Sequence, residues 1–133
     1  MRASLSALIA VAVALSLPAC GISGPSANTD ETFSATLRVG GQNVHNFIVG
    51  KSGEFTVKLT ALSPDGGSIV GTAWGSPTTD GRCLPFSGYV NNFSTSNKTI
   101  LGGPIQPGTF CIEVFDVGLL TAPQNYTLVV SHP

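Results

Sequence analysis

The feature that most constrains the fold of this chain is the alternation of apolar and polar residues in short segments. Phe55, Val57 and Leu59 alternate with threonine and lysine, and four other segments share this period of two. They are 33–39, 45–49, 110–114 and 126–130. Successive side chains of a β-strand point to opposite faces, so this period predicts strands with one buried face. No helical period of 3.6 residues occurs after the N-terminal leader, which indicates an all-β protein.

Glycine and proline separate these segments, at intervals of roughly 8 to 12 residues. Turn-forming residues stand at 40–43, 64–67 and 102–108. The sequence therefore predicts a jelly-roll-like antiparallel β-sandwich of about seven to nine short strands. We expect the segments at 33–39 and 45–49 to form a hairpin. The pattern weakens between residues 75 and 97, where we expect loops and short strands.

The N-terminus has the layout of a secretory signal peptide. Arg2 precedes an uncharged apolar run from residue 5 to residue 17. This run is shorter than the roughly 20 residues that cross a membrane as a helix, so cleavage after residue 19 is expected. The sequence Leu17-Pro18-Ala19-Cys20 resembles a bacterial lipobox. The resemblance implies diacylglyceryl attachment to the Cys20 sulfur and acylation of its new amine, with chains such as palmitate.

A lipidated Cys20 implies an envelope protein attached to a membrane by its acyl chains. Gly21, which follows it, resembles the pattern that directs lipoproteins to the outer membrane where the host has two membranes. Residues 20–29 are small and polar, which predicts a flexible tether, and residues 30–133 are enough for one domain. Five basic and seven acidic residues follow the leader, for a net charge of −2. This charge gives no electrostatic support to a nucleic-acid partner.

Cys83 and Cys111 remain as a pair if Cys20 carries lipid. In an oxidising compartment we expect them to form a disulfide. The alternative is two buried thiols that act as small apolar groups. No histidine or second cysteine lies at metal-ligand spacing from either one, so we expect no metal here.

Catalytic signatures are absent from the sequence. His45 and His132 are the only side chains whose ordinary pKa is near neutral, and neither lies in a Gly-X-Ser-X-Gly or His-Glu-X-X-His motif. We expect His45 to be an exposed strand residue and His132, next to the C-terminus, to be mobile. We therefore predict no catalytic residue and no cofactor. A small hydrolase that uses His45 is the less favoured alternative.

Three aspartates stand where chain turns are expected. Asp65 and Asp80 precede glycine and could offer oxygen ligands to calcium, although Asp-Gly is also ordinary turn chemistry. Calcium is the weaker interpretation of the two. Asp116 stands at the end of a predicted strand, where we expect it to accept hydrogen bonds from backbone N–H groups.

Four aromatic residues in or beside the irregular middle of the chain are candidates for binding: Trp74, Phe86, Tyr89 and Phe93. Aromatic faces on loops can stack on sugar rings or receive a partner protein. Core packing is the competing interpretation, most of all for Trp74, which continues the alternation of Val70 and Thr72. Tyr89 and Phe93 are less constrained.

The C-terminal third resembles bacterial pre-peptidase C-terminal domains, which are small β-sandwiches. The similar elements are the Pro107-Gly108 turn, the strand at 110–116 that ends in Asp116, and the final strand at 126–130. The segments 45–49 and 53–57 resemble the early hairpin of that family, so the resemblance covers about residues 31–131. It implies the fold, and a role in adhesion, secretion or calcium binding beside a hydrolase. This chain has no room for a peptidase, so no role tied to one is carried over.

These observations favour a non-enzymatic envelope lipoprotein whose β-sandwich binds a protein or a glycan. The alternative is a structural or assembly component of an envelope complex, whose strand edges pair with another protein.

Overall fold

The computed structural model describes residues 28–133, which form eight β-strands and no helix. The strands are β1 (Thr29–Leu37), β2 (Gln42–Val49), β3 (Gly53–Ser63), β4 (Val70–Pro77), β5 (Cys83–Ser94), β6 (Lys98–Ile105), β7 (Gly108–Phe115) and β8 (Gln124–His132). Within these residues there is thus no helix that could span a membrane.

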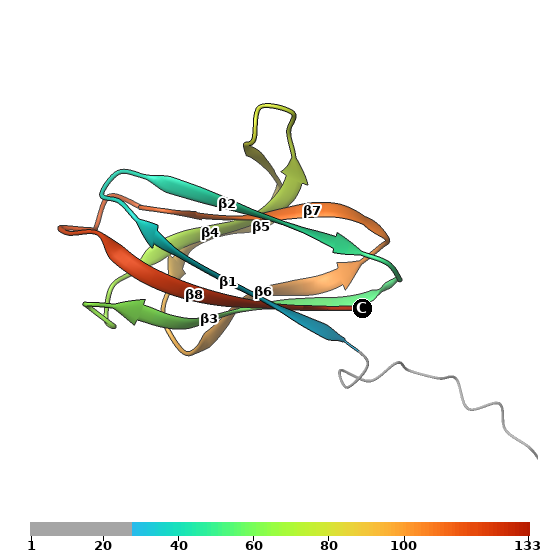
Figure 1. Ribbon diagram of the computed structural model, residues 1–133, viewed down its shortest axis with the longest axis horizontal. Helices are drawn as coiled ribbons and strands as arrows, with labels where there is room; N and C mark the ends of the chain where they lie inside the picture. Colours follow the sequence, from blue (N-terminus) through green and yellow to red (C-terminus); the bar gives the residue numbers. More distant parts are fainter. Residues whose placement is uncertain (1–27) are drawn as a thin grey trace, which may run out of the picture.

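The strands form two four-stranded antiparallel sheets that pack face to face (Figure 1). Sheet A has the order β1-β8-β3-β6, and sheet B has the order β2-β7-β4-β5. The first strand pairs with the eighth, the second with the seventh, the third with the sixth and the fourth with the fifth. This nested pairing is the jelly-roll arrangement, so the predicted fold class is confirmed.

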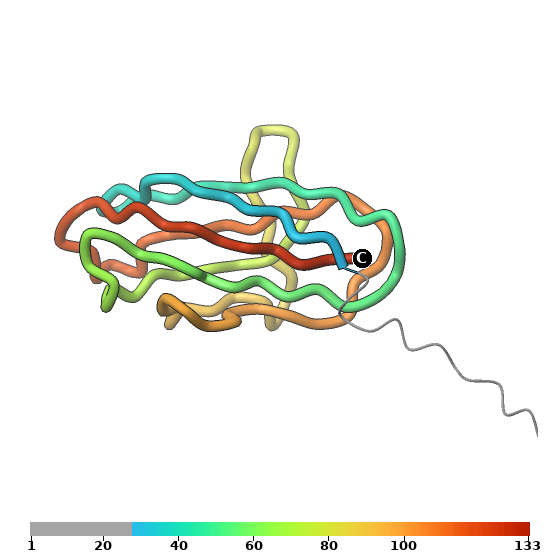
Figure 2. Tube along the Cα trace, turned by 60° about the horizontal axis from the view of Figure 1, so that its bottom comes forward, coloured from blue at the N-terminus to red at the C-terminus, as the bar shows by residue number. Residues whose placement is uncertain are grey.

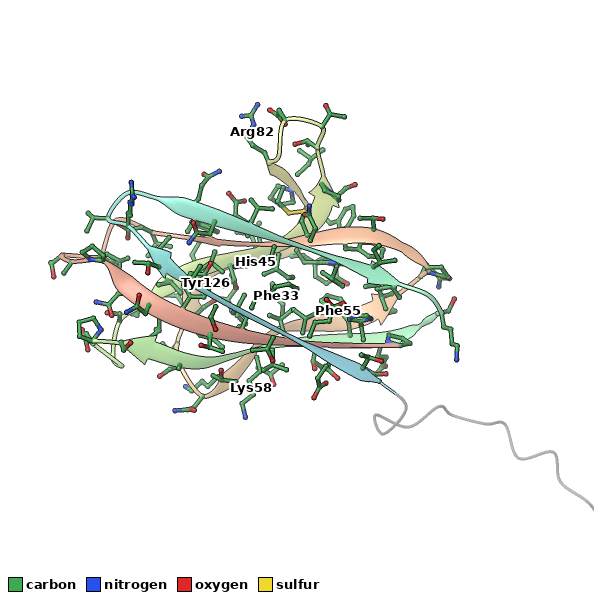
Figure 3. The ribbon with its side chains drawn as sticks, viewed as in Figure 1. Phe33, His45, Phe55, Lys58, Arg82 and Tyr126 are labelled. Atoms are coloured by element: carbon green, nitrogen blue, oxygen red, sulfur yellow. A yellow bond between two sulfur atoms is a disulfide. The ribbon has the colours of Figure 1, made fainter. Side chains whose placement is uncertain are left out.

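The alternating segments supply the core between the sheets. On β3, Phe55, Val57 and Leu59 are fully buried, while the residues between them are exposed. Figure 3 shows Phe55 between the sheets and Lys58 pointing outward from β3. Leu128 and Val130 of β8 are also fully buried, as is Ile112 of β7. The sequence pattern therefore predicts the buried face of these strands correctly.

The hairpin predicted at 33–39 and 45–49 is wrong. β1 pairs with β8 in sheet A, and β2 pairs with β7 in sheet B. The chain passes between the sheets through the turn at 38–41, where Gly40 has a φ of 68° and the Gly41 N–H donates to the Arg38 carbonyl at 2.9 Å. A short polar turn between two alternating segments suits a hairpin and a corner equally well, because the alternation does not say which strands pair.

The weak pattern between residues 75 and 97 corresponds to a long irregular strand. β5 runs for 12 residues, but its pairing with β4 shifts at two places. Between the pairs Ala73–Val90 and Gly75–Pro85, β4 has one residue and β5 has four. Such a bulge moves side chains off the regular alternation, which explains why a period of two is not visible there.

The C-terminus is held by the sheet and does not support the expected mobility of His132. Thr29 pairs with His132 across β1 and β8, and the chain ends beside the start of β1 (Figure 2). The His132 side chain is buried, and its Nε2 atom lies 2.7 Å from a carboxylate oxygen of Glu31. This residue is therefore part of the fold, because β8 continues to the end of the chain.

Candidate functional site

The outer faces of the two sheets differ in chemistry. The outward positions of sheet A carry polar residues such as Ser34, Thr56 and Lys58. Their side chains also bond to one another across strands. The hydroxyls of Ser34 and Thr127 lie 2.9 Å apart, and the Thr36 hydroxyl donates to the Asn125 side-chain carbonyl at 2.6 Å. Sheet A therefore has the solvated outer face that is usual for a sandwich.

The outer face of sheet B is apolar by comparison. Six large apolar residues of the described chain are strongly exposed, and none of them lies on a strand of sheet A. Ile48 belongs to β2, while Leu84, Val90 and Phe93 belong to β5. Phe93 is 77% exposed and Ile48 is 70% exposed. Phe93 and Leu119 line one hollow, and such a cluster of exposed apolar side chains on a small domain indicates an interaction surface.

A projecting hairpin, here called the arm (residues 76–84), stands out from the body of the sandwich (Figure 1). The backbone at Leu84 and Pro85 crosses β4 at Gly75 so closely that a Cβ on Gly75 would lie 2.0 Å from the Leu84 carbonyl oxygen. Glycine is required at this crossing.

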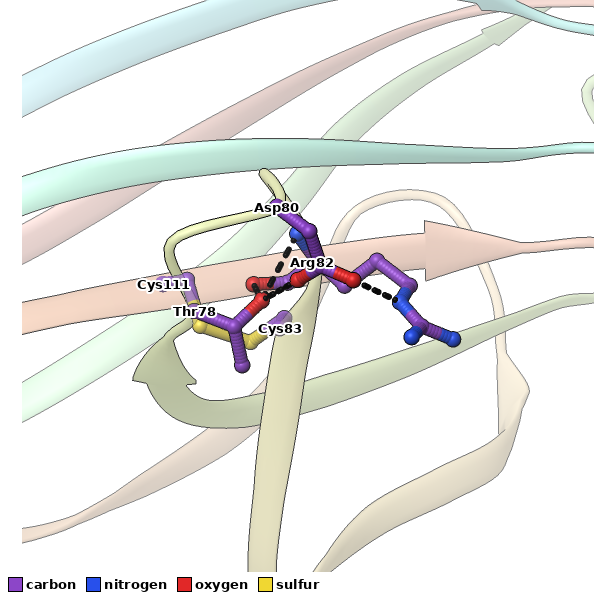
Figure 4. The surroundings of a disulfide bond; sticks show 5 residues. All are labelled: Thr78, Asp80, Arg82, Cys83 and Cys111. Carbon is purple, nitrogen blue, oxygen red and sulfur yellow. Dashed lines mark hydrogen bonds and ion pairs between the residues drawn. A yellow bond between two sulfur atoms is a disulfide. The ribbon is translucent and has the colours of Figure 1, made fainter.

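The arm is fastened by a disulfide between Cys83 and Cys111 of β7, so the expected bond is confirmed (Figure 4). At its tip, Asp80 accepts hydrogen bonds from the Thr78 hydroxyl and from Arg82 Nε, the latter at 2.8 Å. The Thr78 N–H also donates to the Arg82 carbonyl at 2.9 Å. These bonds hold the tip in one shape, and Arg82 stands at the end of the arm (Figure 3).

Two shallow hollows lie side by side on the outer face of sheet B and share Phe115 as a wall. The Phe93 hollow, of about 370 Å³, is lined by Asn92, Phe93, Phe115, Val117 and Leu119. The Glu113 hollow, of about 280 Å³, is lined by Ala73, Pro85, Val90, Glu113, Phe115 and Asp116 together with the turn at 40–42. The ring of Phe115 lies on Gly71, where a Cβ would be 2.2 Å from ring atom Cε2.

Glu113 is the charged residue at the centre of this face. It pairs across the strands with Ala73 of β4 and Val44 of β2, both apolar. Burial raises the pKa of its carboxyl group above the ordinary value, and no neighbouring charge or hydrogen bond offsets that effect. Of the two ion pairs formed within residues 28–133, neither includes Glu113.

Asp116 has the structural role that its position predicts. Its carboxylate accepts hydrogen bonds from the backbone N–H groups of Gly40 at 2.8 Å, Gly118 at 2.8 Å, Leu119 at 3.0 Å and Leu120 at 3.2 Å. These bonds, that from Gly40 foremost, lower the pKa of Asp116. The carboxylate thereby joins the turn after β1 to the loop after β7.

The two calcium candidates, Asp65 and Asp80, lie in different turns. Asp65 accepts hydrogen bonds from the Gly67 N–H at 2.9 Å and from the Ser68 hydroxyl at 3.2 Å, which is turn chemistry. Asp80 is bonded within the arm. No group of three or more acidic, histidine or cysteine residues gathers for a metal anywhere from residue 28 to residue 133.

Three of the four aromatic candidates pack against one another inside the sandwich. The ring centroid of Trp74 lies 4.7 Å from that of Phe86 and 4.6 Å from that of Tyr89, both edge-on. The ring centroid of Phe55 lies 4.4 Å from that of Trp74. Trp74 is buried, and Phe86 and Tyr89 are half-buried over it. Only Phe93, in its own hollow, presents a free aromatic face.

His45 is half-buried, contrary to the expected exposed position. Its ring stacks on Phe33 with a centroid separation of 4.9 Å, and its Nε2 atom lies 2.7 Å from the Tyr126 hydroxyl (Figure 3). Burial lowers the pKa of His45. On β2 it points inward like Phe47 and Val49, so the alternation already gave its direction.

Glu113 is not among the candidate residues that the sequence predicts. The available signal was an acidic residue within the apolar run of β7, on the face opposite Ile112 and Val114. The predicted signal peptide, Cys20 and most of the predicted tether lie outside the described residues. The sequence matches no protein-family model, and no curated protein is similar to it.

Proposed function

We propose that this protein is a non-enzymatic, lipid-anchored envelope protein that binds a protein partner through the outer face of sheet B. The observation that carries the proposal is the contrast between the two outer faces. Sheet A presents threonine, serine and lysine, whereas sheet B and its loops present Ile48, Leu84, Val90, Phe93 and Leu119. An apolar patch with polar surroundings is the usual anatomy of a protein interface.

A protein partner is favoured over a glycan by the positions of the aromatic rings. Sugar binding needs exposed aromatic faces, and Trp74 is buried under Phe86 and Tyr89. Phe93 alone would give a single stacking surface among apolar neighbours, with few polar groups to bond sugar hydroxyls.

Two of the four edge strands are poorly suited to pairing with another chain, whereas the edges β1 and β2 are regular. β5, one edge of sheet B, is interrupted by its bulge, and β6, one edge of sheet A, contains Gly102, Gly103 and Pro104. Bulges and proline are the features by which edge strands avoid pairing with other chains. For catalysis we propose no residue, because the Nε2 atom of each histidine already contacts a side chain of the fold: the Tyr126 hydroxyl for His45 and the Glu31 carboxylate for His132.

Site-specific photo-crosslinking in cells tests this proposal with the full chain. A photoreactive residue at Phe93 or Leu119 samples sheet B, and the same residue at Thr56 or Lys58 is the matched control on sheet A. We expect one adduct of defined mass from the first pair and none from the second. Equal adducts from both faces, or no adduct from Phe93 and Leu119, would contradict the proposal.

A further inference from the structure

The Glu113 hollow has the form of a receptacle for one side chain. Ala73 and Glu113 stand opposite each other on its floor, and Val90 pairs with Ala73 from the next strand. Pro85, at the base of the arm, and Phe115 form its walls. Its volume of about 280 Å³ is large enough for one side chain. The hollow therefore suits a single side chain of a larger partner.

The two acidic residues at this hollow, Asp116 and Glu113, differ in whether the fold supplies hydrogen-bond partners for their carboxylates. The Asp116 carboxylate, at the rim, accepts four backbone N–H groups and is held ionised. Glu113 has no such partner within residues 28–133, and its cross-strand neighbours are apolar. A half-buried carboxylate without a partner is unfavourable in the isolated protein, and a cation would remove that cost. The hollow is thus negative, with apolar walls.

The neighbouring Phe93 hollow offers a second place for a side chain of the same partner. It shares Phe115 with the Glu113 hollow and is lined by Phe93, Val117 and Leu119. The two hollows differ in character. The Phe93 hollow is mostly apolar, with Asn92 as its polar residue, whereas the Glu113 hollow has a carboxylate at its floor. A segment that fills both would carry a large apolar residue close to a basic one.

We propose that the Glu113 hollow receives a lysine or arginine side chain of the protein partner, with an apolar neighbour of that residue in the Phe93 hollow. The carboxylate of Glu113 pairs with the cationic head, and Val90, Pro85 and Phe115 pack against the apolar stem. Lysine and arginine are suited to such sites because their long stems pack on apolar surface while the head stays polar. This inference rests on the proposed function and names the residue type that the face recognises.

The test uses a photoreactive residue at Leu119 in the full chain, combined with Glu113→Gln. Glutamine keeps the size of the side chain and removes its charge. We expect the adduct yield to fall about tenfold, or about 1.4 kcal/mol of binding free energy. The matched control is Glu54→Gln on the outer face of sheet A, which leaves the yield unchanged. Thermal unfolding of the Glu113→Gln protein at or above the wild-type temperature shows that the loss is not one of folding.

Mass spectrometry of an adduct formed from Val90 identifies the partner segment. We expect a lysine or arginine within a few residues of the attachment point, and a charge reversal there to restore crosslinking to Glu113→Lys. An unchanged yield in Glu113→Gln would contradict the proposal that the hollow binds a basic residue. It would not contradict the proposal that sheet B binds a protein partner. Adducts with a second copy of this chain or with lipid would also overturn the hollow as a basic-residue site. Complete absence of adducts in the wild type would instead reject the proposed function.

Discussion

His45 illustrates how a single side chain links burial to pH. The ring is neutral in its packed position against Phe33 and Tyr126, because burial lowers its pKa below the ordinary 6.5. An unfolded chain therefore binds a proton at this position at a higher pH than the folded one does. By linkage, the folded state loses stability as the pH falls through 6.5 toward the lowered value, and the contribution is fully present above 6.5.

Replacement of His45 by glutamine should reveal this effect. Above pH 7.5 the His45→Gln protein is expected to be less stable by about 0.5–1 kcal/mol, because the aromatic contact with Phe33 is lost. The difference should narrow as the pH falls below 6.5. Urea unfolding at several pH values measures it, and the other titratable groups cancel because both proteins share them. A difference that is constant with pH would contradict the neutral, buried ring.

Gly71 determines the position of Phe115, the wall between the two hollows. We predict that Gly71→Ala displaces the ring toward solvent, because a Cβ would lie 2.2 Å from it. Displacement of one outward ring should cost about 1 kcal/mol of the free energy of unfolding. Gly50→Ala is the control, since nothing lies within 4 Å of a Cβ there. If the displaced wall matters for docking, crosslinking from Leu119 falls in Gly71→Ala and not in Gly50→Ala.

At the scale of the elements, the position of the arm is fixed by one covalent bond, the disulfide between Cys83 and Cys111. The disulfide joins residues 28 apart in sequence and ties the start of β5 to β7. On the loop-entropy model, closing such a loop stabilises the folded state by roughly 3.5 kcal/mol. We predict a loss of this size for the double substitution Cys83→Ser and Cys111→Ser, measured by urea unfolding under non-reducing conditions. A loss below about 0.5 kcal/mol would contradict this prediction.

Strands with a polar outer face could be predicted from the alternation of their residues. The strands of sheet B were harder to predict, because parts of their outer face are covered. β3 alternates cleanly because its outward residues, Thr56 and Lys58, meet water. β4 is buried on both faces from Val70 to Gly75, because the arm and the Phe115 ring cover its outward side, so its sequence does not alternate in polarity. The pairing of strands was not predictable either. It depends on contacts between residues far apart in sequence, such as Phe33 with Leu128.

The dependence on contacts between distant residues also explains why the sequence did not predict the environment of the aromatic residues or of Glu113. Trp74, Phe86 and Tyr89 were visible as aromatic residues, but the bulge that folds them together was not. Glu113 became a candidate only when β4 and β2 placed Ala73 and Val44 on either side of it. The half-burial of this carboxylate depends on the neighbouring strands, so the spacing of residues in the sequence does not predict it.

At the scale of the whole molecule, the Glu113 hollow and the start of β1 lie toward opposite ends of the sandwich. β1 begins at Thr29, and the turn at 40–42 that borders the Glu113 hollow follows its far end. Nine residues of strand span about 30 Å at the usual rise per residue. A chain attached to a membrane through Cys20 would thus present the Glu113 hollow about one domain length away from Thr29, where a partner can approach it.

The lipid attachment itself can be tested by Cys20→Ser. Each buried methylene contributes about 0.8 kcal/mol to membrane attachment, so several acyl chains hold a protein permanently, whereas a chain with net charge −2 after its leader has no electrostatic attraction to an anionic surface. We predict that the wild-type protein fractionates with membranes and that Cys20→Ser appears in the soluble fraction or keeps its leader. Cys83→Ser with Cys111→Ser is the control, since it also replaces cysteine residues, here the disulfide pair, but leaves the anchor. Unmodified Cys20 by intact-mass analysis, or equal membrane retention of both variants, would reject the anchor. The crosslinks at Phe93 and Leu119 are a separate test, because they depend on the outer face of sheet B and not on the lipid.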